Sequence, residues 1–290
     1  MGHGKLKKFA ENETFRCLLQ PDAAAILDKQ PGSRELRLKD HPVKGRWGTD
    51  LFGNDHPIIL ELGCGKGDYT IALALRHPEL NFIGVDIKGA RLWKGAKYAT
   101  EHSLPNVAFL RTRIEFISAF FAAGEVSEIW LTFSDPQLHG SENSRLSSPL
   151  FLERYRSFLR PGGIIHLKTD SRYLYEYTRA VVQVNGLEVL ASGTDIYHDG
   201  VSVRKNGQIS GQDEPGPLYD LEAVWEVQTF YEKMFLEMGL PITYLAFRID
   251  HEGAYAFPGA AFDHEYWLEA EGPRRSFSHQ PTAKPATPQS

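Results

Sequence analysis

The segment P-I-I-L-E-L-G-C-G-K-G, Pro57–Gly67, decides how this chain folds. A short apolar run ends in Glu61, and glycines follow at alternate positions, Gly63, Gly65 and Gly67. A continuous apolar run is typical of a strand that is buried on both faces of a parallel sheet. Glycines directly after such a strand let the backbone turn tightly and approach a ligand closely. The segment therefore predicts the first strand and the cofactor loop of a nucleotide-type α/β domain.

The rest of the domain alternates short apolar runs with amphipathic stretches. Further strands are predicted at 81–86, 107–110, 126–133, 164–169, about 187–190 and 242–248. Helices are predicted at 69–76, 88–102, 114–123, 149–159, 172–184 and 221–238. Such alternation gives right-handed crossover units and a parallel sheet with helices on both faces. Because a final helix and strand follow the α/β units, the pattern indicates a seven-stranded Rossmann-like methyltransferase sheet whose last strand is antiparallel.

Three other stretches define the predicted domain limits. Residues 1–50 are rich in Lys and Arg with interspersed acids, which predicts a basic N-terminal arm, either solvated or touching phosphate. Residues 199–220 are dominated by Gly, Pro and polar side chains, which predicts a long loop within a domain that spans 51–250. Residues 251–290 form a C-terminal extension, and we expect disorder from about residue 272 because that stretch has almost nothing to bury.

The composition limits the compartment and the partners. A chain of 290 residues with 42% hydrophobic side chains can bury a large core. Its formal net charge is -5, so a nucleic-acid partner requires a local basic patch. The two cysteines, Cys17 and Cys64, make no disulfide framework, and neither a signal peptide nor a membrane span is recognisable. We therefore expect a cytoplasmic protein without a membrane partner or a metal site, as a monomer or a homodimer.

Two classes of cofactor compete for the glycine loop. A dinucleotide-binding fingerprint, G-x-G-x-x-G, would need its third glycine at the position of Asp68. An S-adenosylmethionine domain instead places an acid near the end of its first strand, as Glu61 does, and packs glycines against the cofactor. Asp86 ends the second predicted strand, where a carboxylate can bind ribose hydroxyls or, alternatively, cap a helix. Together these residues favour a methyltransferase over a dehydrogenase.

A second polar constellation follows the fourth and fifth predicted strands. Asp135 lies in F-S-D-P, 133–136, just beyond the carboxyl end of its strand, and Asp170 ends the next strand. In open α/β sheets such positions face the ligand crevice, so both carboxylates should open onto it. A plain Asp-Pro turn is the alternative for Asp135. In methyltransferases that act on a ring or exocyclic nitrogen, however, a short motif at this place meets the base.

The ordered set of motifs resembles the bacterial tRNA (guanine-N7)-methyltransferases, a family of class I S-adenosylmethionine-dependent enzymes. The resemblance extends from about Lys5 to Ile249. It is carried by E-L-G-C-G-K-G (61–67), F-I-G-V-D-I-K-G-A-R (82–91), R-I-E-F-I (113–117), F-S-D-P (133–136), R-L-S-S-P-L-F-L-E-R-Y (145–155), H-L-K-T-D-S (166–171) and T-F-Y-E (229–232). It implies transfer of a methyl group from S-adenosyl-L-methionine to a guanine in the variable loop of tRNA.

The resemblance also implies roles for individual residues. Asp135 matches the acid taken as the catalytic or base-positioning group. The positions implied for the cofactor are Glu61, Gly63, Gly65, Gly67, Asp86, Arg113 and Glu115. Those implied for the tRNA substrate are His139, Asp170, Thr229, Phe230, Tyr231 and Glu232.

One departure from the family pattern concerns the stretch after Asp135. The family usually has a cluster of Lys, Arg and His there, whereas residues 137–145 contain a single clear cation, Arg145. Phosphate could instead be gripped by cations that begin one predicted helix, although a solvated helix face would show the same pattern: Lys88, Arg91, Lys94 and Lys97. Two alternatives therefore stay open, a non-catalytic tRNA-binding protein that retains the fold and a small-molecule methyltransferase.

Overall fold

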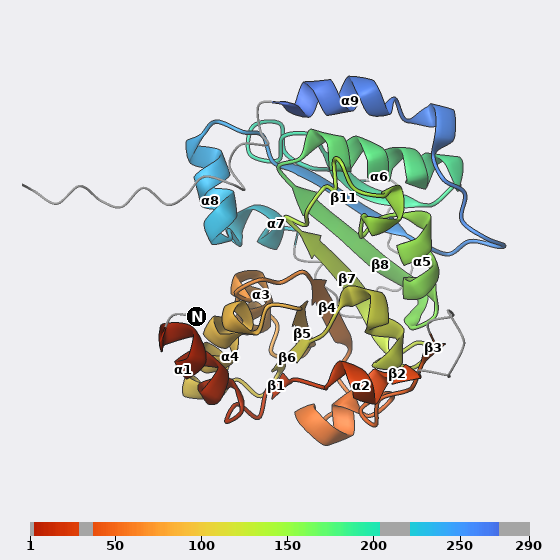
Figure 1. Ribbon diagram of the computed structural model, residues 1–290. Coiled ribbons are helices and arrows are strands. Elements are labelled where there is room, and N and C mark those ends of the chain that lie inside the picture. Colours follow the sequence, from red (N-terminus) through yellow and green to blue (C-terminus); the bar gives the residue numbers. More distant parts are fainter. Residues whose placement is uncertain (1–2, 29–36, 204–220, 273–290) are drawn as a thin grey trace, which may run out of the picture.

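A computed structural model describes residues 3–28, 37–203 and 221–272 of the chain. Its centre is a sheet whose strands lie in the order β1-β6-β5-β4-β7-β8-β11-β9-β10 (Figure 1). The bounds of these strands are β1 Leu18–Leu19, β4 Ile58–Leu62, β5 Asn81–Asp86, β6 Val107–Arg111, β7 Val126–Thr132, β8 Leu159–Thr169, β9 Val189–Gly193, β10 Ser202–Val203 and β11 Thr243–Arg248. A separate pair consists of β2 Leu27–Asp28 and β3 Arg37–Leu38.

The pairing directions confirm the predicted fold class. Strands β6, β5, β4, β7 and β8 are mutually parallel, and β11 is antiparallel to both β8 and β9. The seven strands from β6 to β9 thus form the expected sheet with its last strand inserted antiparallel. The count differs from the predicted seven, because the two-residue strands β1 and β10 extend the two edges.

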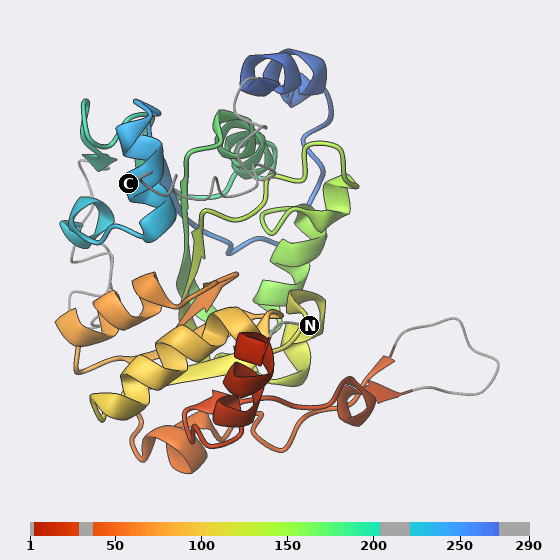
Figure 2. The same cartoon turned by 60° about the vertical axis from the view of Figure 1, so that its left-hand side comes forward.

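Helices cover both faces of the sheet (Figures 1 and 2). Their bounds are α1 His3–Asn12, α2 Ala23–Ile26, α3 Asp68–Arg76, α4 Gly89–Glu101, α5 Pro149–Arg156, α6 Arg172–Val184, α7 Ala223–Glu226, α8 Phe230–Glu237 and α9 His264–Glu271. One apolar core joins α5 and α6 to the sheet, and a second joins α3 and α4 to its other face. Strand β4 shows why its run is continuously apolar, since Leu60 belongs to the first core and Ile59 to the second.

Several predicted elements differ in their limits. The helix predicted at 221–238 is two short helices, α7 and α8, because Thr229 caps a new helix start. The helix predicted at 114–123 is a 3-10 helix, Ile114–Ala119. The strand predicted around 187–190 is β9, which begins at Val189.

The ends of the chain add layers outside the two cores. Helix α1 packs on α4, which places the N-terminal segment beside the helix that follows β5 (Figure 2). Trp47 is fully buried, and its indole N–H donates to the carbonyl of Phe120 at 2.9 Å. Helix α9 packs along α6 at the other end of the molecule. The predicted loop at 199–220 and the predicted disorder from about 272 lie mostly outside the described residues.

Candidate active site

The glycine loop after β4 has the backbone form that its sequence requires. Gly63, Gly65 and Gly67 have φ angles of 81°, 57° and 74°, which side chains strongly disfavour. A Cβ atom on Gly67 would lie 2.5 Å from Cε1 of Phe109, whereas one on Gly63 or Gly65 would meet nothing within 4 Å. The loop is therefore packed tightly at the start of α3 and open above its first two glycines.

Asp86 at the end of β5 ties this loop to the neighbouring strand. The N–H of Gly65 donates to its Oδ2 at 3.0 Å, and the N–H of Lys88 donates to its Oδ1 at 2.7 Å. The N-cap of α4 is Lys88, so Asp86 does not cap that helix itself and instead binds the backbone of the turn that leads into it, at the carboxyl edge of the sheet. The remaining lone pairs of its two oxygens can accept hydrogen bonds from a ligand.

Glu61 is buried between the glycine loop and the strand that leads to Asp135. Its Oε2 accepts from the N–H of Thr70 at 2.9 Å and lies against the hydroxyl of that residue. Its Oε1 accepts from the hydroxyl of Thr132, at the end of β7, at 2.5 Å. Burial raises the pKa of the Glu61 carboxyl from its usual 4.5 to about 7, against the effect of these hydrogen bonds. Glu61 therefore links β4, α3 and β7 through a carboxyl group that can change charge near neutral pH.

The loop after β7 presents Asp135 at the carboxyl edge of the sheet. Phe133 and Gln137, on either side of Asp135, have φ angles of 49° and 50°, which are unusual for residues other than glycine. Asp135 is exposed, and its Oδ1 accepts from the N–H of Gln137 at 2.9 Å. Asp135 thus sits at the centre of a strained turn, an arrangement that is common where a side chain must be aimed.

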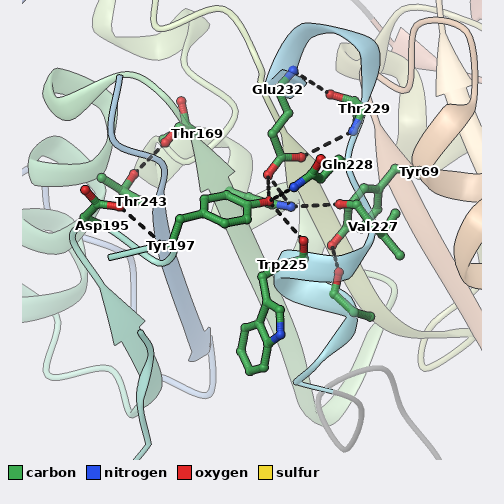
Figure 3. Close-up of polar contacts among 12 residues, drawn as sticks. Tyr69, Thr169, Asp195, Tyr197, Trp225, Val227, Gln228, Thr229, Glu232 and Thr243 are labelled. Atoms are coloured by element: carbon green, nitrogen blue, oxygen red, sulfur yellow. Dashed lines mark hydrogen bonds and ion pairs between the residues drawn. The ribbon is translucent and has the colours of Figure 1, made fainter. Parts of the chain in front are cut away.

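Helix α8 is anchored to β8 by a buried ion pair of Glu232, which also accepts the hydrogen bond from Tyr197 that Figure 3 shows. Nζ of Lys168, on β8, lies 2.7 Å from Oε1 of Glu232, and both side chains are completely buried. The same Oε1 accepts from the hydroxyl of Tyr197 at 2.8 Å, while Lys168 also donates to the carbonyl of Val227 at 3.0 Å. Burial lowers the pKa of Lys168 to about 8 and raises that of Glu232, although the ion pair opposes both shifts.

The T-F-Y-E segment at the start of α8 divides into two pairs of residues. Thr229 and Glu232 form a capping box, in which each side chain accepts from the backbone N–H of the other. Phe230 and Tyr231 point outward instead, with 58% and 42% of their surface exposed, and their rings meet edge to face. Nζ of Lys66, from the glycine loop, lies 4.7 Å from the centroid of the Phe230 ring. The two aromatic side chains are therefore exposed, with Phe230 beside the glycine loop, whereas Thr229 and Glu232 are engaged in holding the helix.

The other predicted residues occupy the same edge of the sheet. Asp170 directly follows β8 and is half-buried, and His139 is exposed on the loop after Asp135. Arg113 and Glu115 follow β6, where Nη2 of the former lies 2.9 Å from Oε1 of the latter; Arg113 is exposed and Glu115 is half-buried.

Comparison with known proteins supports the motif order found in the sequence. A family model described as "Putative methyltransferase" matches residues 55–204. The tRNA (guanine-N(7)-)-methyltransferase of Bacteroides thetaiotaomicron is 41% identical, over 95% of this chain and 98% of its own length. That of Christiangramia forsetii is 46% identical, over 84% of this chain and 97% of its own length. The chain belongs to the tRNA (guanine-N7)-methyltransferase family. A more distant likeness, to the crystal structure of the 16S rRNA methyltransferase KamB, has a TM-score of 0.46 at 16% identity and covers 74% of this chain and 95% of that one.

One residue of this family member has a role that the sequence did not reveal. Arg145, the single cation in the loop after Asp135, is buried, with 4% of its surface exposed. Its guanidinium donates to the carbonyls of Pro136 at 3.2 Å and Gln137 at 3.3 Å, and lies over the rings of Tyr173 and Tyr177. The tyrosines belong to α6, so no local signal in the sequence could have found this contact. Arg145 therefore holds the Asp135 loop from inside and does not present its charge to a ligand.

The cations on α4 lie next to those of α1 in this methyltransferase. Lys8 and Lys97 both lie over the ring of Trp93, at 4.5 and 5.1 Å from its centroid. Lys94 pairs with Asp68 at 2.9 Å and Lys97 with Glu101 at 3.6 Å, while Lys88 and Arg91 are exposed. Three acids, Glu11, Asp68 and Glu101, partly neutralise this surface. No helix within the described residues is long and apolar enough to cross a membrane.

Proposed function

We propose that this protein transfers a methyl group from S-adenosyl-L-methionine to N7 of a guanine in tRNA. The observation that carries the proposal is the bond between Glu61 and Thr132, which joins the glycine-loop strand to the strand that leads into the Asp135 loop. Because β4 and β7 are neighbouring parallel strands, a cofactor on one loop and a base on the other would meet at the same edge of the sheet. Membership of the tRNA (guanine-N7)-methyltransferase family supports the same reaction.

The residues of the cofactor half fit S-adenosylmethionine. The space above Gly63 and Gly65 would let the backbone approach the amino-acid end of the ligand, and Asp86 has lone pairs for ribose hydroxyls. Arg113 and Glu115 lie after the adjacent parallel strand, where the adenine ring would be expected. When bound, the cofactor supplies a methyl group that its sulfonium charge has already activated.

The residues that would contact the methyl acceptor, the guanine base, mainly have to orient it. N7 of guanine has a free lone pair, so no group of the protein has to remove a proton before the attack. Asp135 would accept hydrogen bonds from N1 and the exocyclic amine of guanine and stabilise the positive charge that develops on the ring. Positioning of two reactants can contribute about 7–11 kcal/mol, which leaves little need for acid–base chemistry. Phe230 and Tyr231 would offer exposed faces on which an unstacked base can rest.

The phosphate backbone of tRNA would be met by the basic surface of α1 and α4. Since Arg145 is buried, the loop after Asp135 contributes no exposed arginine, and another surface has to supply the phosphate contacts. Lys8 and Lys97, both close to the ring of Trp93, and the exposed Lys88 and Arg91 at the start of α4 give such a surface in a chain of net charge -5. We infer that α1, which packs on α4, belongs to the tRNA-binding surface.

A methyl-transfer assay on bulk unmodified tRNA tests the proposal. The protein is incubated with tRNA and labelled S-adenosylmethionine, and the nucleosides are analysed by mass spectrometry. We expect 7-methylguanosine from the wild type and a loss of at least about 100-fold in Asp135→Ala, the size of effect seen when a group that stabilises the transition state is removed. Absence of 7-methylguanosine on every tRNA would refute the function. Cofactor binding without transfer, unaffected by Asp135→Ala, would indicate a non-catalytic tRNA-binding protein.

A further inference from the structure

The loop that carries Asp135 is held by contacts that lead away from the crevice. Its turn contains two non-glycine residues with positive φ, Phe133 and Gln137, a conformation that persists only if the surroundings impose it. Arg145 supplies part of this constraint, because its guanidinium binds the carbonyls of Pro136 and Gln137, directly after Asp135. The orientation of Asp135 therefore depends on where the Arg145 side chain is held.

Arg145 is in turn held by Tyr173 on α6. Its Nη2 donates to the phenolic oxygen of Tyr173 at 2.6 Å, and the guanidinium lies 5.0 Å from the centroid of the same ring. That phenolic oxygen also lies 2.7 Å from Nδ1 of His264. Because a guanidinium can only donate, the Tyr173 hydroxyl accepts from Arg145 and is free to donate its own proton to the imidazole. The line Arg145–Tyr173–His264 is thus a directed chain of two hydrogen bonds.

His264 begins α9, which lies along α6 at the outer end of the molecule (Figure 1). Two further contacts fix α9 there. Oε2 of Glu271 accepts from the N–H of Tyr173 at 3.1 Å, and the ring of Phe262 meets the rings of Tyr173 and Tyr177 edge to face. All of these groups lie outside residues 55–204, except the two tyrosines. The segment that they define, Phe262–Glu271, is called the C-terminal brace below.

We propose that the C-terminal brace positions the Asp135 loop for the methyl acceptor, through His264, Tyr173 and Arg145. This inference rests on the proposed function, since it assigns these side chains to the acceptor half of the same site. None of them touches the crevice edge formed by the glycine loop, so the brace acts on how the base is oriented and leaves cofactor binding alone. Arg145, Tyr173 and His264 are positioning residues, and the C-terminal extension has a task in the reaction.

Substitutions along the chain of hydrogen bonds test the proposal in the full-length protein. Tyr173→Phe removes both hydrogen bonds and keeps the ring, and we expect kcat on unmodified tRNA to fall by about 10-fold to 100-fold, as for a small misplacement of a reacting group. His264→Ala removes one hydrogen bond at an exposed side chain, with an expected loss in kcat of about 3-fold to 10-fold. His264→Asn, whose amide oxygen can accept the proton of Tyr173, should restore most of the loss. Affinity for S-adenosylmethionine, measured by calorimetry, should stay unchanged in all three.

Hydrogen exchange separates this inference from the proposed function. The amides of residues 135–148 should exchange faster in Tyr173→Phe and His264→Ala than in the wild type, whether or not the protein methylates any tRNA. Glu265→Ala, at an exposed position on the same helix, is the matched control and should change neither exchange nor kcat. Unaltered exchange in both variants overturns the brace. A parallel loss of kcat, cofactor affinity and thermal stability also overturns it, because that pattern indicates a general structural role. If Tyr173→Phe does not fold, the comparison of His264→Ala with His264→Asn provides the test.

Discussion

The stability of the protein should depend on pH through the buried carboxyl of Glu61, whose pKa is raised by burial. Its pKa is about 7 in the folded protein against an ordinary value of 4.5, so the folded state holds a proton that the unfolded state releases. For a group whose folded pKa is raised, stability is fully present below the unfolded pKa and is lost as pH rises through the folded one. At 1.36 kcal/mol per pKa unit, the whole effect is about 3 kcal/mol, most of which falls between pH 5 and pH 8.

The substitution Glu61→Gln isolates this contribution. An amide keeps an acceptor for the N–H of Thr70 and a donor for the hydroxyl of Thr132, so it imitates the protonated carboxyl. Other groups titrate in both proteins, so the quantity to measure is the difference in unfolding free energy between variant and wild type. We expect the variant to gain about 2–3 kcal/mol relative to the wild type from pH 5 to pH 8, measured by urea denaturation.

A flat difference across this pH range would refute the reasoning, because it would mean that Glu61 keeps its ordinary pKa despite burial. Glu252→Gln, at an exposed position, is the control and should leave the pH profile unaltered. If the expected slope is found, a cationic cofactor near Glu61 should favour the charged carboxylate and release a proton on binding near pH 6.5, which calorimetry in buffers of different ionisation enthalpy would detect.

Three other perturbations have outcomes that follow from the contacts described. Gly67→Ala should cost about 1–3 kcal/mol more than Gly53→Ala, since both positions have positive φ but only the first would bring a Cβ atom against the ring of Phe109. Lys168→Met should cost about 3–5 kcal/mol by leaving Glu232 buried without its partner, and a second change, Glu232→Leu, should recover much of it. Arg91→Glu should weaken tRNA binding and lower the slope of log K against log salt by about 1 or more.

Each of these predictions has an outcome that would contradict it. Equal losses at Gly67 and Gly53, measured by chemical denaturation, would show that the Phe109 ring moves aside at little cost. If the Lys168→Met single variant were as stable as the wild type, the buried pair would not be ionised. For Arg91→Glu the control is Lys39→Glu, on the segment next to β3, and an equal loss of tRNA affinity in both would argue against a local phosphate contact.

The positions of polar residues at strand ends could be predicted from the sequence. Glu61, Asp86, Asp135 and Asp170 each lie at or just past the end of an apolar run, and a parallel sheet places such ends at one edge. Local sequence patterns were sufficient there because the end of a strand and the glycine turn after it are determined by neighbouring residues. The capping box of Thr229 could also have been read from its T-x-x-E spacing, although the helical pattern from 221 to 238 concealed the break.

Contacts between distant segments could not be predicted in the same way. The sequence showed Arg145 only as the single clear cation of residues 137–145, and its contact with the rings of Tyr173 and Tyr177 depends on the fold. The ordered structure within residues 1–50 could not be predicted for the same reason. Its short helix α1 and the buried Trp47 depend on α4 and Phe120 for their partners, which lie far along the chain.

The geometry of α8 changes what the T-F-Y-E segment can contribute to base recognition. Glu232 already binds Lys168 and Tyr197 with one carboxylate oxygen and the N–H of Thr229 with the other, so both oxygens are committed inside the protein. A direct bond from Glu232 to a base would have to break a fully buried ion pair, at a cost of several kcal/mol. The exposed aromatic faces of Phe230 and Tyr231 carry no such cost. Base contacts at this segment are therefore better made by stacking, with the acid and the threonine acting to hold the aromatic pair at the crevice.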